Sequence, residues 1–464
     1  MKKVLMLLAA FVLTLSLVAC GSESTEPTEF QEEGAVLNIR VWNDEFIGRF
    51  RNYYPGYLRT LEDGTDLLDD GTIVNWIQVA NDNNGYQNAL DTALLNQDNA
   101  SADDKIDMFL IEADYAKKYA NDLYALDVKG DLGIPETTLD QQYQYTKDIV
   151  TDDSGVLRAV SWQATPGLFA YRTDVAETVL GTSDPVAVQA LLNNWTKFDA
   201  AAVDMKAAGY AMISGYDDAY RAYSNNTSAP WVNEDSEIIV DDQIIEWIKQ
   251  TKTYSDNGYN NGSGLWSQEW FTDMGPNGSA FGFFFSTWGI NFVLSGGSLA
   301  DSEQPAELGN GLFGQYRVIE GPASFYWGGT WLVGAKGTDN PTLVADIMMK
   351  MTMNENIMTD ITLDTEDYTN HMDAMDAIAN DDTYGSPFLG GQNHIALFNE
   401  SASTIDMSNI SPYDQGLNES IQNAFKDYFL GTVTWDEAWA EFVEQVTTLY
   451  PELTLEDYPA DPFN

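Results

Sequence analysis

The fold prediction rests on the stretch KIDMFLIEADYAKKYAND, residues 105–122. Its first half is an apolar run typical of a buried β-strand, and the run ends in two acids, Glu112 and Asp114. Its second half begins a helix. A strand followed by a helix is the repeating unit of a parallel α/β sheet, in which ligands bind beyond the carboxyl ends of the strands. The two acids are therefore candidates for ligand contacts.

The same alternation of strands and helices extends outward from this stretch in both directions. We expect further strands at 36–42 and 75–80, within 275–294, and as a pair at 324–337 that turns on Gly328 and Gly329. Residues 158–175 hold two apolar runs split by Thr-Pro-Gly, which we interpret as a crossing between lobes. The spacing of apolar residues predicts helices over 86–97, 186–208, 241–257, 341–352, 417–430 and 434–449.

The length and charge of the chain limit the possible functions. At 464 residues the chain is longer than one hydrophobic core usually fills, so two lobes are expected. The formal net charge is −50. Nucleic acids and anionic membrane surfaces reward Lys and Arg, so neither is an expected partner. No motif predicts a cofactor or a metal, and the two histidines, His371 and His394, lie far apart without the helical spacing of a zinc protease.

The only cysteine, Cys20, lies in a context that predicts lipidation. Lys2 and Lys3 precede the apolar run 4–16, and the sequence Leu-Val-Ala-Cys follows it at 17–20. This pattern is typical of a signal peptide, here residues 1–19, and it resembles a bacterial lipobox, in which the cysteine carries the lipid. Residues 20–34 are polar and acidic, as expected of a flexible tether. We therefore expect a protein anchored to the extracellular face of the cell membrane.

Four stretches in the same order carry a resemblance to a known family. They are VWNDEF at 41–46, IEADYAKKYANDLYALD at 111–127, FFFSTWGIN at 283–291, and WGGTWLVGAKGTDNPTLVADIMMKMT at 327–352. Together they resemble the extracellular solute-binding proteins of carbohydrate ABC importers, the group that includes maltose-binding protein. The resemblance implies a two-lobe periplasmic-binding-protein-like α/β fold with a ligand cleft between the lobes. The implied lobes are 35–162 plus 329–370 and 163–328 plus 371–464.

The resemblance also implies a function and partners. We expect a receptor without enzymatic activity, a monomer, that captures a sugar, most simply an oligosaccharide, and delivers it to the membrane subunits of an ABC permease. The acidic insertion at 61–72 and the long carboxyl-terminal segment depart from the smaller members of the family.

A sugar ring is held by aromatic planes against its faces and by amides or carboxylates that accept bonds from its hydroxyls. The chain places both residue types at predicted strand ends and crossings. The candidate ligand-binding residues are Trp42, Asn43, Asp44, Glu45, Glu112, Asp114, Trp162, Gln163, Asp217, Asp218, Trp231, Trp288, Trp327, Trp331, Tyr413 and Asp414. Position in the family favours Asn43, Asp44, Glu112, Asp114, Trp288, Tyr413 and Asp414.

Several of these candidates have a second interpretation. Asp44 and Glu112 precede predicted helices, where acids commonly cap the helix. Trp288 fits either ligand contact or core packing. Trp162, Trp327 and Trp331 lie beside the predicted crossings, where lining the cleft and stiffening the hinge are equally consistent with the sequence.

Two other classes of function remain open from the sequence. A surface glycoside hydrolase needs only a pair of carboxylates, and 72 acidic residues make that condition easy to meet. Such an enzyme would cleave its oligosaccharide, whereas a receptor would return it intact. A partner-binding lipoprotein is the third class, and it would bind no small ligand in a cleft.

Overall fold

The structure is a computed structural model that describes residues 34–455 and 458–463. Residues 1–33, which include Cys20, the predicted signal peptide and nearly all of the predicted tether, lie outside the described residues. Two sheets organise the described chain. We call each sheet, together with the helices that pack on it, a lobe.

The sheet of the first lobe has seven strands in the order β2-β3-β4-β1-β5-β12-β6. Its central strand β1 pairs in parallel with β4 and β5, whereas β12 runs antiparallel between β5 and β6. The strands are β1 Val36–Val41, β2 Tyr57–Thr60, β3 Asp66–Leu68, β4 Ile73–Gln78, β5 Met108–Glu112, β6 Val160–Ser161 and β12 Thr330–Gly334. The expected parallel sheet is therefore mixed, and the acidic insertion supplies part of an antiparallel edge.

The sheet of the second lobe has five strands in the order β11-β7-β10-β8-β9. Strands β7 and β10 are buried along their whole length, because both of their faces are covered. The strands are β7 Gly167–Arg172, β8 Ala211–Gly215, β9 Asn260–Ser263, β10 Ala280–Ser286 and β11 Tyr316–Ile319. All strands of each sheet come from the segments assigned to one predicted lobe, and the exact lobe boundaries stay a prediction.

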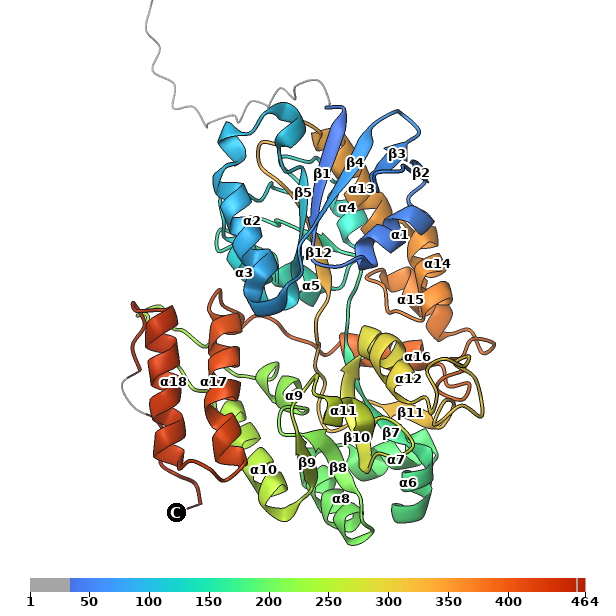
Figure 1. The fold of residues 1–464 in the computed structure, drawn as a ribbon, viewed down its shortest axis with the longest axis vertical. Coiled ribbons are helices and arrows are strands. Elements are labelled where there is room, and N and C mark those ends of the chain that lie inside the picture. Colours follow the sequence, from blue (N-terminus) through green and yellow to red (C-terminus); the bar gives the residue numbers. More distant parts are fainter. Residues whose placement is uncertain (1–33, 456–457, 464) are drawn as a thin grey trace, which may run out of the picture. The chain divides into compact units, whose positions relative to one another are not determined.

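Helices cover both sheets. In the first lobe, α3 packs on β5 and β12 while α13 packs on β12 and β6, and Figure 1 shows α2 and α3 beside the sheet. Its helices are α1 Glu45–Tyr53, α2 Gly85–Leu95, α3 Ala113–Ala120, α4 Glu136–Leu139, α5 Gln144–Asp148, α13 Pro341–Met353 and α14 Glu355–Thr365. Helix α15 Met372–Ala379 packs against both α14 and α16 and so joins the helices of the two lobes.

The remaining helices belong to the second lobe. They are α6 Thr173–Val179, α7 Pro185–Leu192, α8 Trp195–Ala207, α9 Tyr220–Ser224, α10 Asp242–Asn257, α11 Gln268–Asp273, α12 Ser295–Gly297, α16 His394–Ala402, α17 Asp414–Phe429 and α18 Trp435–Leu449. The long helices α17 and α18 pack against each other (Figure 1). A capping box fixes the start of α18, in which Thr434 and Glu437 bond each other's backbone N–H.

Two predicted elements differ from the structure. The helix expected over 186–208 is two helices, because Asn194 adopts an extended backbone and its side chain caps α8 by accepting from the Lys197 N–H. The strand pair expected at 324–337 is one strand, β12. The segment before it turns at Gly328 and Gly329, whose φ angles are +73° and +105°, so it cannot continue a strand.

Candidate functional site

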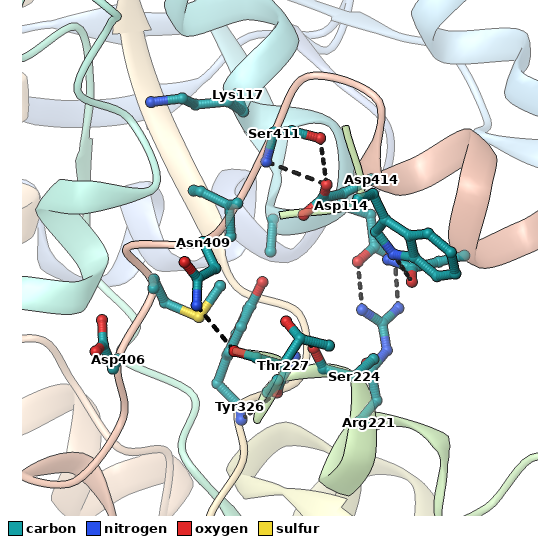
Figure 2. Close-up of a pocket in the computed structure, with 16 residues that line it drawn as sticks. Asp114, Lys117, Arg221, Ser224, Thr227, Tyr326, Asp406, Asn409, Ser411 and Asp414 are labelled. Carbon is teal, nitrogen blue, oxygen red and sulfur yellow. Dashed lines mark hydrogen bonds and ion pairs between the residues drawn. The ribbon is translucent and has the colours of Figure 1, made fainter. Parts of the chain in front are cut away.

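A pocket lies where residues of both lobes meet (Figure 2). Its wall is built from the start of α3 in the first lobe and, in the second lobe, from α9, the loop 225–231, Tyr326 and residues 406–418. Three of the predicted ligand residues line it: Asp114, Trp231 and Asp414. We call it the interlobe pocket.

Asp114 and Arg221 form a paired contact across the interlobe pocket. The two terminal guanidinium nitrogens of Arg221 donate to the two carboxylate oxygens of Asp114 at 2.5 and 2.6 Å. The Asp114 carboxylate and its hydrogen bonds raise the pKa of Arg221 further above its ordinary value, against the opposing effect of burial. The pair joins α3 of the first lobe to α9 of the second.

Glu112 and Asp414 lie at the starts of two helices. Glu112 ends β5 and caps α3, where its carboxylate accepts from the Asp114 N–H at 2.8 Å. Asp414 is the first residue of α17, and its Oδ1 accepts from the Ser411 N–H and hydroxyl at 3.1 and 2.5 Å. Burial raises the pKa of both carboxyls, that of Asp414 to about 7, and the neighbouring Asp114 charge adds to the effect.

An aromatic surface on the second lobe is made by two of the candidates, Trp288 and Trp327, together with Trp266. The Trp266 and Trp288 rings lie nearly parallel, with their centres 6.1 Å apart and 15° between their planes. Trp327 meets Trp288 edge-on and stacks on Phe285. The Trp266 side chain is 52% exposed, which is unusual for an indole. We call these three residues the tryptophan cluster.

Asp217 and Asp218 accept hydrogen bonds from residues on either side of Trp266 in the chain. Both carboxylate oxygens of Asp217 accept from the Leu265 N–H at 3.1 Å, directly before Trp266. The Asp218 carboxylate accepts from the Trp270 indole at 2.8 Å and from two backbone N–H groups. Trp266 itself has a φ of +67°, a conformation that side chains other than glycine rarely adopt. These bonds hold the loop in that conformation, and backbone strain of this kind is typical of binding sites.

Beside the tryptophan cluster, a polar network ties the crossing segments together. The buried Asp367 carboxylate accepts from Arg49, Gln163 and Thr287, at 3.0, 3.0 and 2.6 Å. Thr287 precedes Trp288. Gln163 also donates to Glu45 at 2.9 Å, and burial raises the pKa of Glu45 to about 7. The Trp288 indole donates to the Trp327 carbonyl, and a side chain at Gly328 would meet that indole nitrogen at 2.9 Å.

The other predicted tryptophans are packed among the chain's own residues. Trp162 is 1% exposed and stacks on Phe46, and Trp331 is 1% exposed and donates its indole N–H to the Thr146 carbonyl. Trp42 packs edge-on against Tyr86. Trp231, at the interlobe pocket, donates to the Asn418 side chain at 2.9 Å.

Three polar candidates lie at helix starts. Asn43 accepts from the Glu45 N–H through its side chain, and Asp44 precedes α1 without making a side-chain cap. Both side chains are exposed. Tyr413 precedes α17 and packs edge-on against Tyr450.

Sequence reasoning missed Arg221, Trp266 and Asp367. Trp266 lies in GSGLWSQ, and a tryptophan among glycines and polar residues is the pattern that identified the other aromatic candidates. Arg221 and Asp367 had no local signal, because their partners lie 107 and up to 318 positions away in the chain.

Within residues 34–455 and 458–463, no group of three or more histidine, cysteine or acidic residues is arranged to hold a metal ion. No helix in the same part of the chain is long and apolar enough to cross a membrane.

Comparison with known proteins rests on structure. No protein-family model matches the chain, and no curated protein matches its sequence. A crystal structure described as an extracellular solute-binding protein family 1 member superimposes with a TM-score of 0.70 at 15% identity, covering 89% of this chain and 99% of the other.

Two further similar structures come from bifidobacteria. The ABC-transporter-associated binding protein of B. animalis subsp. lactis, in complex with β-1,6-galactobiose, has a TM-score of 0.65 at 16% identity and covers 91% of this chain and 100% of its own. The galacto-N-biose-/lacto-N-biose I-binding protein of Bifidobacterium longum has a TM-score of 0.64 at 13% identity, with 92% and 100% covered. The predicted fold class is therefore confirmed: the chain has the two-lobe α/β fold of the extracellular solute-binding proteins.

Proposed function

We propose that the chain is an extracellular carbohydrate receptor that captures a sugar and delivers it to the permease of an ABC importer. The observation that carries the proposal is the tryptophan cluster. Exposing an indole to water is unfavourable unless a ligand covers it, and the flat apolar face of a sugar ring matches the face of Trp266. The sugars bound to proteins of the same fold support the proposal.

Carboxylates at the interlobe pocket and in the polar network beside the tryptophan cluster suit the hydroxyls of such a ligand. Glu45, Glu112 and Asp414 have raised pKa values because burial disfavours their charged forms. A hydroxyl that donates to one of these groups would replace the lost water and would gain a charge-assisted hydrogen bond. Since the aromatic and polar candidates come from several segments, we propose an oligosaccharide as the ligand, and binding energy that favours closure of the lobes around it.

The test is a thermal-shift screen of the purified protein against neutral oligosaccharides, followed by chromatography of each mixture. A ligand at about a thousand times its dissociation constant stabilises the folded state by roughly 4 kcal/mol. A shift with one class of glycan that is recovered uncut supports the receptor. Cleaved products would make the protein an enzyme, and no shift with any sugar would contradict the proposal.

The aromatic surface is tested by Trp266→Ala. We expect it to weaken binding of the sugar found in the screen by about 1–3 kcal/mol, the range for stacking of a flat ligand on an aromatic ring. Phe463→Ala is the matched control, since that side chain is also 53% exposed but belongs to the carboxyl-terminal segment. Equal affinities of the two variants would remove Trp266 from the site.

Lipid anchoring at Cys20 is a separate part of the proposal. Cys20→Ser should move the protein from the membrane fraction to the medium, because the serine oxygen does not accept the lipid that a lipobox cysteine carries. If the variant and the parent protein fractionate together, the anchor assignment is wrong.

A further inference from the structure

The charges at the interlobe pocket restrict which sugars it can take. Among the described residues that line the pocket, two are cationic: Lys117 and Arg221. Three are acidic: Asp114, Asp406 and Asp414. An anionic sugar, such as a uronate or a sulfated sugar, would need a free cation or free backbone N–H groups in this wall.

Both cations are already engaged by groups of the chain itself. Both terminal nitrogens of Arg221 already donate to Asp114, so the charges of this pair cancel inside the pocket. The Lys117 ammonium donates to the Thr151 carbonyl at 2.5 Å and lies 3.9 Å from the Asp153 carboxylate. Figure 2 shows the end of its side chain pointing away from Asp114 and Asp414.

The helix starts that reach the pocket carry acids of the chain itself. The N-terminus of a helix carries partial positive charge and would attract an anion. At α3 the Glu112 carboxylate takes the Asp114 N–H, and at α17 the acid Asp414 occupies the first turn and accepts from the Ser411 N–H. At both helix starts the charge of an acid in the chain therefore opposes the attraction of the helix N-terminus for a ligand carboxylate or sulfate.

What remains in the pocket is negative. The Asp414 carboxylate accepts hydrogen bonds from the backbone and side chain of Ser411, which is uncharged, and Asp406 is exposed at the rim of the pocket. Burial raises the pKa of Asp414 to about 7, so above that pH its carboxylate carries a negative charge inside the pocket. An anionic ligand in the pocket would lie closer to these carboxylates than the screening length, which is about 8 Å at physiological salt. Salt would therefore not remove the repulsion between them.

From this arrangement we propose that the interlobe pocket is a charge filter, which accepts uncharged sugars and rejects sugars that carry a carboxylate or a sulfate. The inference deepens the receptor function proposed above and rests on it. Hydroxyl groups can donate to Asp414 and Asp406, whereas an ionised acid has no proton to donate and meets like charge.

The test compares three forms of one glycan by calorimetry at pH 8 and low salt. The probes are β-1,6-galactobiose, lacto-N-biose and maltotriose, each also oxidised at C6 of its non-reducing sugar to the uronate and then converted to the uncharged uronamide. For whichever parent sugar binds, we expect the uronate to bind at least tenfold more weakly and the uronamide to regain most of the affinity. Because uronate and uronamide have nearly the same size, the difference between them measures charge alone.

A pair of variants places the effect at the pocket. Asp414→Asn should reduce the ratio of uronamide to uronate affinity several-fold, whereas Asp204→Asn, which removes the same charge from the exposed surface of α8, should leave the ratio unchanged. A uronate that binds as tightly as its uronamide, or a ratio that Asp414→Asn does not change, would overturn the filter. A uronate that binds while the neutral form does not would overturn it and leave the receptor proposal intact. If no form of any sugar binds, the receptor proposal itself fails.

Discussion

The guanidinium of Arg221, on α9 of the second lobe, donates two parallel hydrogen bonds to the carboxylate of Asp114, on α3 of the first lobe. The Arg221 side chain is 19% exposed and that of Asp114 is 29% exposed. Bidentate pairs with this little exposure to water are stronger than ordinary surface pairs. The contact therefore contributes to stability as well as to the charge of the pocket.

Arg221→Met tests this contribution. We expect it to lower the free energy of unfolding by about 1–3 kcal/mol, because it leaves the Asp114 carboxylate partly buried without its partner. Urea denaturation measures the change. Lys249→Met is the control, since it breaks a surface pair with Glu246 and should cost less than about 0.5 kcal/mol. Similar values for both variants would show that the Asp114–Arg221 pair acts as an ordinary surface pair.

Asp217→Ala tests how the Trp266 loop is held. Loss of the two bonds to the Leu265 N–H should allow the strained backbone at Trp266 to relax, so the indole would leave its position beside Trp288. We expect several-fold weaker sugar binding and faster hydrogen exchange at the Leu265 amide, with a nearly unchanged melting temperature. Exchange at Leu265 as slow as in the parent protein would contradict this role.

Trp288→Ala should weaken binding of the oligosaccharide by about 1–3 kcal/mol, measured by calorimetry, if the ring contacts the sugar. Trp288→Phe is the comparison, because it keeps an aromatic face but loses the hydrogen bond to the Trp327 carbonyl. Affinity retained by Phe and lost by Ala would indicate stacking. Equal losses in both variants would indicate that the hydrogen bond, and hence the position of the crossing, is what matters.

Trp331→Phe should affect stability and leave affinity unchanged. The ring is buried within the first lobe, and its N–H bonds the Thr146 carbonyl at 2.8 Å. Loss of this bond and of part of the ring should cost about 1–3 kcal/mol in the free energy of unfolding. A changed dissociation constant in the folded variant would return Trp331 to the ligand site.

Stability should fall as the pH rises from about 5 to about 8. Burial raises the pKa of Glu45 and Asp217 to about 7 and that of Asp218 to about 6. The folded chain therefore holds protons that the unfolded chain has lost above pH 4, so raising the pH removes stability until the folded pKa is passed. The buried histidines, with lowered pKa values, act in the opposite direction but are only two.

The experiment compares free energies of unfolding at pH 5.5 and pH 8. Glu45→Gln, which keeps the size of the side chain, should show a smaller loss between the two values than the parent protein. Higher stability at pH 8 than at pH 5.5 would contradict the prediction.

Local sequence patterns were sufficient to predict the elements that depend on neighbouring residues alone. The apolar run ending at Glu112 predicted β5 and a possible helix cap, because both depend on neighbouring residues. The break between α7 and α8 depends on the backbone of Asn194, which helical periodicity does not reveal. The antiparallel placement of β12 between β5 and β6 depends on partners far away in the chain.

The candidate site divides in the same way. The residue types predicted the aromatic and acidic character of the site, and Trp288 and Asp114 do lie beside Trp266 and Arg221. The sequence could not show that Trp288 is partly exposed while Trp331 is buried. Trp288 follows an apolar strand and Trp331 lies within one, so their local sequences are alike. Asp217 and the Leu265 N–H that it bonds are 48 positions apart in the chain, so no local pattern predicts this hydrogen bond.

The bonds at Asp367 have a mechanical consequence. This single buried carboxylate receives hydrogen bonds from α1, from the first crossing and from the end of β10 in the other lobe. A rotation of one lobe against the other stretches bonds in proportion to their distance from the axis, and breaking several bonds to one buried charge is costly. For the lobe closure proposed above, we therefore expect a rotation axis close to Asp367, where the hydrogen bonds to this carboxylate are stretched least.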